Sequence, residues 1–412
     1  MSTWLVPRSE LTPDQLRAVE LPHKEHQVIY GAPGSGKTMV LLHRAHELRQ
    51  RMGSSSDKFR IVVFTRVLKS YIRSGLALLD LPESSVTTFD DWCRKFYEAR
   101  ISRYLPWNYE ERKPDFEAVR RAVADWITER STPPLFDFVM VDEGQDLDGI
   151  CFEILRRVAR HVTVCMDHRQ QIYEGGSTES EVLQILGLRR RQVTLLDAYR
   201  CSPYVARLAA QLLRVPEERE QYLNQVRTVQ KERETPLLYI ASDFEDEKQR
   251  LIDVLRQRLL VDQRIAVLFP LKRQVHGFAT GLREAGIEVE DQENLHFASR
   301  RPKLITIHSA KGLTFDTVLL PRIVPASFPE GKSGEKLRNL LFVAITRAER
   351  WVYLSTVNSK VPPIVRELEK LAATRQITVQ RFEEAPDIDE LSSHEYLDEW
   401  HTVEDEDELD FL

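Results

Sequence analysis

Long apolar runs are missing from this sequence of 412 residues. No stretch reaches about 18 consecutive apolar residues, the length that a membrane-spanning helix requires. The residues after Met1 also lack the charged start and apolar centre of a signal peptide. We therefore expect a protein with neither a helical membrane span nor a secretion signal.

Cysteine is scarce as well. The four cysteines, Cys93, Cys151, Cys165 and Cys201, are scattered and form no Cys-x-x-Cys pair. This spacing argues against a zinc site and against a disulfide framework. It is typical of free thiols in a reducing compartment, so we expect a cytoplasmic protein whose only metal is the Mg²⁺ discussed below.

Lysine and arginine are absent from residues 382–412, a segment that contains 14 Asp and Glu. The other 50 acidic residues stand against all 58 Lys and Arg, so residues 1–381 carry a net charge of +8 although the whole chain carries −6. A basic body suits a polyanionic partner. The acidic tail is expected to be disordered, either as a solvated end or as an arm that binds a partner protein or competes with nucleic acid.

A glycine-rich loop follows the first predicted strand of the chain, residues 28–30. It carries the P-loop signature, formed by Gly31, Ala32, Pro33, Gly34, Ser35, Gly36, Lys37 and Thr38, and an amphipathic helical pattern follows at residues 39–48. Glycines let backbone N–H groups approach phosphates closely, and the helix N-terminus adds favourable dipoles. The loop predicts a bound nucleoside triphosphate, with Lys37 on its β- and γ-phosphates and Thr38 on Mg²⁺.

An acidic motif, residues 142–146 (DEGQD), follows a second predicted buried strand, Phe136–Val141. An aspartate at the carboxyl end of a strand in a P-loop sheet is placed to hold Mg²⁺, which assigns Asp142 to the metal. The adjacent Glu143 can accept a proton from an attacking water molecule. Together with the P-loop, this motif predicts ATP hydrolysis.

Apolar strand patterns alternate with helical patterns along most of the chain, which predicts an α/β fold with parallel sheets. Predicted strands lie at residues 61–64, 136–141, 162–166, 193–196, 237–241, 265–269, 303–308, 317–320 and 351–355, and predicted helices at 151–160, 203–213, 247–260, 273–285 and 335–348. We expect a first domain at residues 1–214 with a small, mostly helical insertion at about 94–132. A linker at 215–235 and a second domain at 236–381 then precede the acidic tail.

In sequence order, nine segments resemble the motifs of the superfamily 1 helicases and translocases of the UvrD/PcrA/Rep type. They are residues 11–19 (Q motif), the P-loop (motif I), 62–72 (motif Ia), 86–92 (a DNA-contact motif), 142–146 (II), 170–173 (III), 197–200 (IV), 306–313 (V) and 341–348 (VI). The resemblance implies two RecA-like domains that face one nucleotide site, with ATP and Mg²⁺ as cofactors and single-stranded DNA, or RNA, as partner.

Individual site residues follow from this resemblance. For the nucleotide it implies Gln15 and Tyr199 on adenine, Gln170 as γ-phosphate sensor, Gly312 of motif V near the nucleotide, and Arg200 and Arg347 as arginine fingers. For the nucleic acid it implies Thr65, Arg66, Thr88, Phe89 and His308, although His308 can equally be a structural histidine. An arginine on the second domain would require that the two domains close over ATP before it is hydrolysed.

The sequence departs from the family pattern mainly on the nucleic-acid side. No tryptophan follows Tyr173 in motif III, Asp90 replaces a usual histidine and is expected to repel phosphate, and Thr314 replaces a usual glutamate. The insertions are also short, so we expect poor unwinding of duplexes. The alternatives are therefore a nucleic-acid-responsive ATPase subunit that regulates a partner, such as a nuclease in anti-phage defence, and an ATP-binding switch.

Aromatic and basic residues are interleaved within residues 92–113. The aromatic residues are Trp92, Phe96, Tyr97, Tyr104, Trp107 and Tyr109. They can form a surface on which the bases of a single strand stack, or the core of a small helical subdomain. The sequence leaves both interpretations open.

Overall fold

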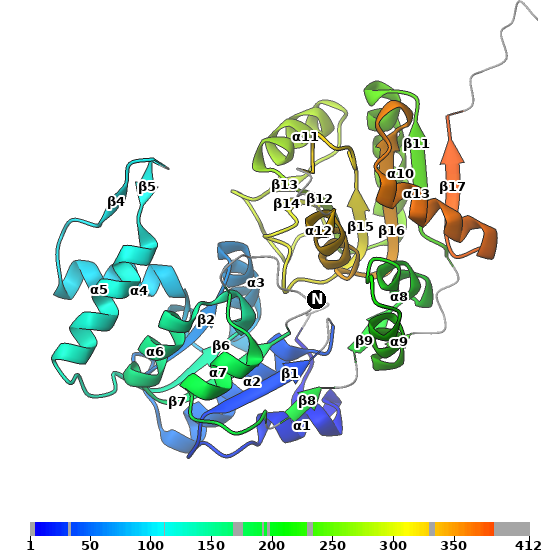
Figure 1. Ribbon diagram of the computed structural model, residues 1–412. Coiled ribbons are helices and arrows are strands. Elements are labelled where there is room, and N and C mark those ends of the chain that lie inside the picture. Colours follow the sequence, from blue (N-terminus) through cyan, green and yellow to red (C-terminus); the bar gives the residue numbers. More distant parts are fainter. Residues whose placement is uncertain are drawn as a thin grey trace, which may run out of the picture.

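Two parallel β-sheets, each covered by helices, form the two halves of the protein (Figure 1). The computed structural model describes residues 5–31, 34–110, 112–167, 176–191, 193–195, 198–228, 234–328 and 334–382. The predicted α/β class with two parallel sheets is confirmed. Within these ranges the structure contains no helix that is both long enough and apolar enough to cross a membrane.

The first sheet has, among the described residues, the strand order β3, β2, β6, β7, β1, β8, and every neighbouring pair is parallel. Its strands are β1 (Gln27–Gly31), β2 (Phe59–Val63), β3 (Val86–Thr88), β6 (Phe136–Val141), β7 (Ala159–Met166) and β8 (Val193–Leu195). The central strands are buried almost throughout, which explains why they are continuous apolar runs in the sequence.

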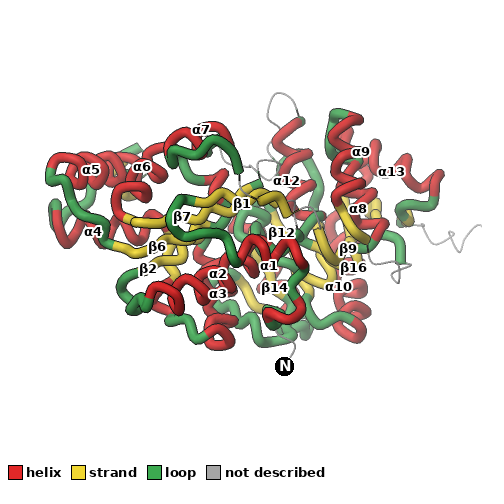
Figure 2. The backbone as a smooth tube through the Cα atoms, turned by 90° about the horizontal axis from the view of Figure 1, so that it is seen from below, coloured by secondary structure: helices red, strands yellow, loops and turns green. Residues whose placement is uncertain are grey.

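Helices cover both faces of the first sheet (Figure 2). On one face lie α2 (Lys37–Met52) and α3 (Arg66–Leu76), and on the other lie α4 (Phe89–Arg100), α5 (Phe116–Glu129) and α6 (Gly149–Val158). Helix α1 (Pro13–Val19) packs on α2, and α7 (Glu179–Ile185) packs on α6. Short 3₁₀ turns in the chain are η1 (Arg8–Glu10), η2 (Ala77–Leu79), η3 (Glu83–Ser85), η4 (Gly144–Asp146), η6 (Asn358–Lys360) and η7 (Lys370–Thr374).

The predicted insertion consists of α4, a small antiparallel pair β4 (Trp107–Asn108) and β5 (Lys113–Pro114), and α5, and it projects from one end of the molecule (Figure 1). Its aromatic residues divide into two groups. Tyr97 belongs to the core, and Trp92 and Phe96 pack against it while partly buried, with the rings of Phe96 and Trp126 5.2 Å apart. Three others are exposed, Tyr104 at 83%, Trp107 at 48% and Tyr109 at 85%. The core interpretation therefore holds for the first group, and base stacking on the exposed group stays a prediction.

The second sheet has the order β13, β14, β12, β15, β16, β11, β17 among the described residues, again with parallel pairs only. Its strands are β11 (Leu237–Ala241), β12 (Ile265–Phe269), β13 (Glu290–Asp291), β14 (Lys303–Thr306), β15 (Phe315–Leu320), β16 (Ala348–Val357) and β17 (Thr378–Arg381). Its helices are α10 (Phe244–Val261), α11 (Lys272–Glu284), α12 (Glu335–Ile345) and α13 (Pro363–Glu369).

The segment between the two sheets packs on the second half of the protein. It contains β9 (Ala198–Cys201), α8 (Pro203–Ala210), α9 (Pro216–Gln225) and β10 (Val226–Thr228). Helix α8 contacts α12 and β16, β9 contacts β16, and Ser202 N donates to Glu349 O at 2.7 Å. The sequence assigned residues 198–214 to the first domain and 215–235 to a linker. The packing instead places residues 198–228 with the second half, because α8 contacts β16 and α12, and Tyr222 of α9 meets Phe342 of α12.

A buried arginine ties α1 to the P-loop helix α2. Arg44 is fully buried and donates to the carbonyl oxygens of Val19, Leu21 and Pro22 at 3.0, 2.7 and 3.1 Å, and to Thr163 Oγ1 at 2.9 Å. Burial lowers the pKa of Arg44 to about 10, so the side chain stays charged at neutral pH. These bonds satisfy the carbonyl groups at the end of α1 and hold that helix beside the P-loop.

We predict that Arg44→Met lowers the free energy of unfolding by about 2–5 kcal/mol, because it leaves buried carbonyl groups without donors. Chemical denaturation measures the change. Arg51→Met, on the exposed side of the same helix, serves as the matched control and is expected to change stability by less than about 0.5 kcal/mol. Equal effects of the two substitutions would contradict the role given to Arg44.

Candidate nucleotide site

The P-loop connects the end of β1 to the start of α2. Gly36 is the N-cap of α2 and has φ 81°, a left-handed conformation that favours glycine. A Cβ atom at Gly36 would lie 2.7 Å from Gln15 Nε2, so a side chain there would collide with the Q motif. The local fold therefore requires glycine at this position. Ala32 and Pro33 lie outside the described residues.

Polar groups of the loop are available for an anion. Lys37 is 6% exposed, and its Nζ donates to Gly31 O at 2.7 Å across the loop. Ser35 Oγ is buried and has no hydrogen-bond partner among the described residues. A buried hydroxyl without a partner is costly, and a phosphate oxygen would satisfy it. The loop thus fits a triphosphate.

The acidic motif lies beside the loop. Thr38 Oγ1 donates to Asp142 Oδ2 at 2.7 Å, so the two oxygen ligands expected for Mg²⁺ are already adjacent. Glu143 follows with φ 53°, an unusual left-handed conformation for a residue with a side chain, and it is 3% exposed. Gln145 Nε2 donates to Glu143 Oε2 at 2.6 Å and orients the carboxylate.

The two carboxyl groups are shifted in opposite directions. Burial, followed by the charge of Glu143, raises the pKa of Asp142 to about 6, against the hydrogen bond from Thr38 and the charge of Lys37. Burial also acts to raise the pKa of Glu143, but the charges of Lys311, Lys37 and Arg347 outweigh it and hold that pKa below its ordinary value. Glu143 is therefore ionised at neutral pH and able to accept a proton.

Gln15 borders the phosphate loop and lines the same cavity as Lys37. It is buried at 6%, its Nε2 donates to Ser35 O at 3.0 Å, and its Oε1 accepts from Thr12 N at 3.0 Å in a capping box. The amide is thus held in one orientation by α1. Binding of adenine by Gln15 stays a prediction.

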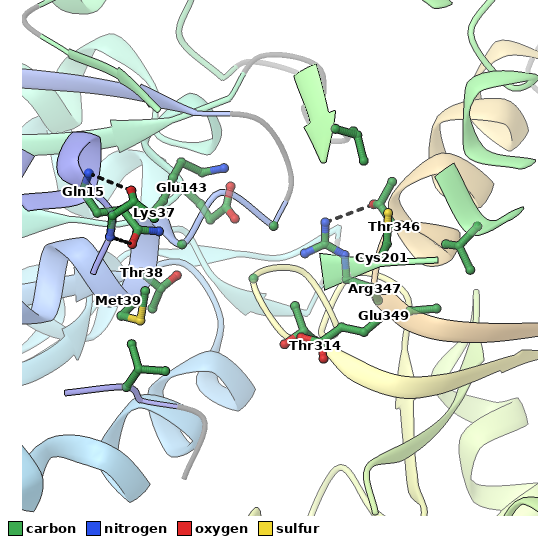
Figure 3. Close-up of a pocket in the computed structure, with 18 of the residues that line it drawn as sticks. Gln15, Lys37, Thr38, Met39, Glu143, Cys201, Thr314, Thr346, Arg347 and Glu349 are labelled. Carbon is green, nitrogen blue, oxygen red and sulfur yellow. Dashed lines mark hydrogen bonds between the residues drawn. The ribbon is translucent and has the colours of Figure 1, made fainter. Parts of the chain in front are cut away.

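Residues from both halves of the protein line one cavity of about 340 Å³. Figure 3 shows Gln15, Lys37, Thr38 and Glu143 on one wall and Thr314, Thr346, Arg347 and Glu349 on the other. Arg347 is 3% exposed, and its Nε donates to Val343 O at 2.9 Å. The arginine of motif VI therefore approaches the P-loop wall from the second sheet.

Gly312 of motif V lies close to two residues of the first half. Gly312 has φ 79°, and a Cβ atom there would lie 3.1 Å from the Leu68 methyl groups and 3.7 Å from Glu143 Oε1. Glycine at this position therefore permits close approach of the second half to the first. It lines the same cavity as Lys37 and Arg347.

A buried ion pair joins the two halves next to the cavity. Lys311 Nζ donates to both carboxylate oxygens of Asp146, at 2.8 and 2.6 Å, and the two side chains are 1% and 0% exposed. Burial raises the pKa of Asp146 to about 7, although the charge of Lys311 opposes the shift. Motif II is in this way attached directly to motif V.

Three residues predicted for the nucleotide cannot be placed by their side chains. Gln170 lies outside the described residues. The backbone of Tyr199 and Arg200 lies in β9, which pairs with β10, but their side chains are outside the description. Cys201, directly after Arg200, does line the cavity. Their roles stay predictions.

The residues predicted for nucleic acid meet partly at one groove. Arg66, Thr88 and Phe89 line a groove of about 890 Å³ between α4, α5 and the carboxyl ends of β2 and β3. Thr65 and Thr88 are N-caps of α3 and α4, and their hydroxyls accept from Leu68 N and Asp91 N.

Phe89 and His308 are less accessible to a nucleic acid than the sequence predicted. Phe89 is 3% exposed and packs against Trp92, so its ring belongs to the core in this conformation. His308 lies outside this groove and is half-buried, and burial together with the charges of Lys336 and Lys311 lowers its pKa. At neutral pH it is therefore uncharged.

Asp90 lines the same groove, and its expected repulsion of phosphate is offset. Arg120 Nε donates to Asp90 Oδ1 at 3.0 Å, and Arg120 NH1 contacts Asp148 at 2.5 Å. The compensating arginine comes from α5 of the insertion, thirty residues away in sequence. No local pattern could have revealed it.

Several cavity residues were missed from the sequence. They are Tyr71, Cys201, Tyr222, Thr346 and Glu349. Thr346 and Glu349 flank Arg347, so adjacency to motif VI was an available signal. Tyr222 lies in the segment predicted as a linker, where nothing in the sequence distinguished it.

Comparison with known proteins locates the same two parts of the chain. Residues 290–359 match the family described as UvrD-like helicase C-terminal domain, and residues 15–176 match an AAA domain. A probable DNA helicase of Mycoplasma pneumoniae is 26% identical over 239 residues, which cover 54% of this chain and 44% of that protein. A probable DNA helicase II homolog of Rickettsia conorii is 36% identical over 83 residues, or 18% of this chain and 12% of the relative. The matches thus span less than half the length of these relatives.

A solved structure is also similar. It is the C-terminal domain of a possible DNA helicase from Lactobacillus plantarum WCFS1, with 18% identity and a TM-score of 0.35, covering 44% of this chain and 98% of that one. Likeness at that TM-score adds nothing to the argument from the sheets themselves.

The raised pKa of Asp142 predicts a pH-dependent metal site. Because protonation removes a Mg²⁺ ligand, half-saturating Mg²⁺ for binding of a fluorescent ATP analogue should rise about fourfold between about pH 7.5 and about pH 5.5. An aspartate with an ordinary pKa would stay ionised over this range. Protonation of the nucleotide itself also changes Mg²⁺ binding with pH. Asp142→Asn is the control, because its half-saturating Mg²⁺ should change with pH only through this smaller effect. Identical profiles for the two proteins would refute the prediction.

The Lys311–Asp146 pair predicts strong coupling between motifs V and II. Lys311→Met leaves a buried carboxyl group without its cation and should lower the free energy of unfolding by about 3–5 kcal/mol. The double variant with Asp146→Asn should recover more than half of that loss, because no uncompensated charge remains. Denaturant titration of the four proteins of this cycle measures both effects, and strict additivity would contradict a direct interaction.

Proposed function

We propose that this chain, which matches a UvrD-like helicase C-terminal domain and an AAA domain, is a UvrD/PcrA-like motor of superfamily 1 that hydrolyses ATP between its two α/β halves to move along single-stranded DNA. The observation that carries the proposal is the composite cavity. Lys37, Thr38 and Glu143 from the first sheet and Arg347 from the second line the same space. A site divided in this way can be completed only when both halves are in place.

The binding of ATP is assigned to the first half of the protein. Lys37 would exchange its bond to Gly31 O for a phosphate oxygen, and Ser35 Oγ would gain the partner that it lacks. Thr38 and Asp142 would hold Mg²⁺, which neutralises phosphate charge when bound. Gln15 and Tyr199 are proposed for adenine, with Gln170 at the γ-phosphate.

Hydrolysis is assigned to four residues with separate tasks. Glu143 accepts the proton of the attacking water, and Gln145 holds its carboxylate in orientation. Arg347, with Arg200 as proposed second finger, stabilises charge that develops on the γ-phosphate, an effect worth about 10³–10⁵ in rate. Because Arg347 belongs to the second half, approach and separation of the halves would accompany each turnover.

The groove lined by Arg66 and Thr88 is our proposed path for the nucleic acid across the first half, with His308 as a contact from the second. DNA is favoured as the track because the relatives are named as probable DNA helicases. The insertion is small, comprising α4, β4, β5 and α5, so we propose translocation with little unwinding of duplexes. No contact or comparison favours the alternative of a subunit that regulates an anti-phage nuclease.

Steady-state ATPase rates test the proposal. Rates are measured without nucleic acid and with single-stranded DNA, duplex DNA or RNA, each at two salt concentrations. We expect strong stimulation by single-stranded DNA that weakens as salt rises, because phosphate contacts release counterions. A rate that no nucleic acid changes would overturn the motor assignment.

Glu143→Gln separates chemistry from binding. The amide has nearly the shape of the carboxylate but is no base, so kcat should fall by about 10²–10⁴ while ATP binding is retained. Retained binding of the fluorescent ATP analogue is the internal control. Normal turnover by this variant would show that another group accepts the proton.

A further inference from the structure

A second cavity, of about 460 Å³, lies at the outer edge of the first sheet. It is lined by residues of β2, α3, the edge strand β3 and α4, and it shares no lining residue with the nucleotide cavity or with the groove of Arg66. Neither the family matches nor the proposed function assigns it a role.

The charges around this cavity are of one sign. The described lining residues include the cations Arg60, Lys69, Arg73 and Lys95 and no carboxylate. The nearby Asp91 is shared by Lys69 at 3.5 Å, Lys95 at 3.1 Å and Arg94 at 3.0 Å, three cations on one carboxylate. A concentration of positive charge of this kind favours an anion in the cavity.

Arg73 supplies an unused donor. Its Nε is buried and has no hydrogen-bond partner among the residues that the structure describes. A buried guanidinium N–H without an acceptor is costly, so an acceptor from outside the chain would be stabilising. The planar donor set of arginine matches phosphate oxygens in particular. Burial, together with the charges of Arg73 and Lys95, also lowers the pKa of Lys69 despite Asp91.

Two aromatic rings complete the lining. Trp92 and Phe96 are partly buried, and their ring centroids lie 5.5 Å apart with an interplanar angle of 37°. Aromatic faces beside cations bind nucleobases by stacking while the cations hold the phosphate. A site for inorganic phosphate alone would not need them, and the volume exceeds that of the ATP cavity.

We propose that this edge cavity binds a nucleotide, with its phosphate on Arg73, Lys69 and Lys95 and its base against Trp92 and Phe96. The nucleotide is either a free mononucleotide or one unit of a DNA strand. The site is separate from the ATP cavity, so the proposal does not rest on the motor function.

Calorimetric titration of the full chain tests the site, with the ATP cavity first saturated by a non-hydrolysable ATP analogue and Mg²⁺. The probes are dTMP, the trinucleotide pTpTpT and inorganic phosphate. Binding of dTMP identifies a mononucleotide site, whereas binding of the trinucleotide alone identifies a strand contact. Either result supports the proposal if Arg73→Ala and Lys95→Ala each weaken binding by about tenfold or more.

Arg273→Ala is the matched control, since Arg273 is exposed on α11 of the other half, and it should leave binding unchanged. Lys95 is 64% exposed, so its substitution is expected to change stability by less than about 0.5 kcal/mol, and its variant keeps the test valid if Arg73→Ala is unstable. The proposal is overturned if neither nucleotide binds, if the two pocket variants bind like wild type, or if phosphate alone binds as tightly as dTMP.

Discussion

A buried ion pair between Lys311 and Asp146 sets the relation between the two halves of this protein. Neither charge is stable in that environment without the other, so the pair is satisfied only when motif V lies against motif II. Once this contact is made, Gly312 lies near Glu143, and Arg347 reaches the wall opposite Lys37. The same cations that approach in this way keep Glu143 ionised. Positioning and electrostatics of the candidate site thus depend on one contact.

The order of the parallel strands explains how the P-loop and the acidic motif come together in the first half. The strands β1 and β6 end at the same edge of the first sheet, separated only by β7. Their carboxyl ends therefore bring the P-loop and the acidic motif together, and Thr38 meets Asp142 at 2.7 Å. The order of the strands and the glycine loop are therefore sufficient to bring Thr38 and Asp142 together, although they lie far apart in the sequence.

Departures from the family pattern are balanced by distant residues. Asp90 is paired with Arg120 of the insertion, and Glu349 lies in the cavity that Thr314 also lines, where a carboxylate is missing from motif V. The insertion therefore contributes a charge to the proposed nucleic-acid groove as well as exposed aromatic residues. The edge cavity with Arg73 depends on the same segment, because α4 supplies two aromatic residues and a lysine.

The sequence by itself determined the strands, the phosphate loop and the acidic motif, because each is encoded by neighbouring residues. Strands at 136–141, 237–241 and 265–269 were predicted with the bounds that the structure has, since buried parallel strands are continuous apolar runs. Only the tertiary structure decided that residues 198–228 pack on the second sheet, that Phe89 is buried, that Tyr222 lines the cavity and that Lys311 pairs with Asp146. These depend on which surfaces meet across long separations in sequence, and local periodicity carries no information about that choice.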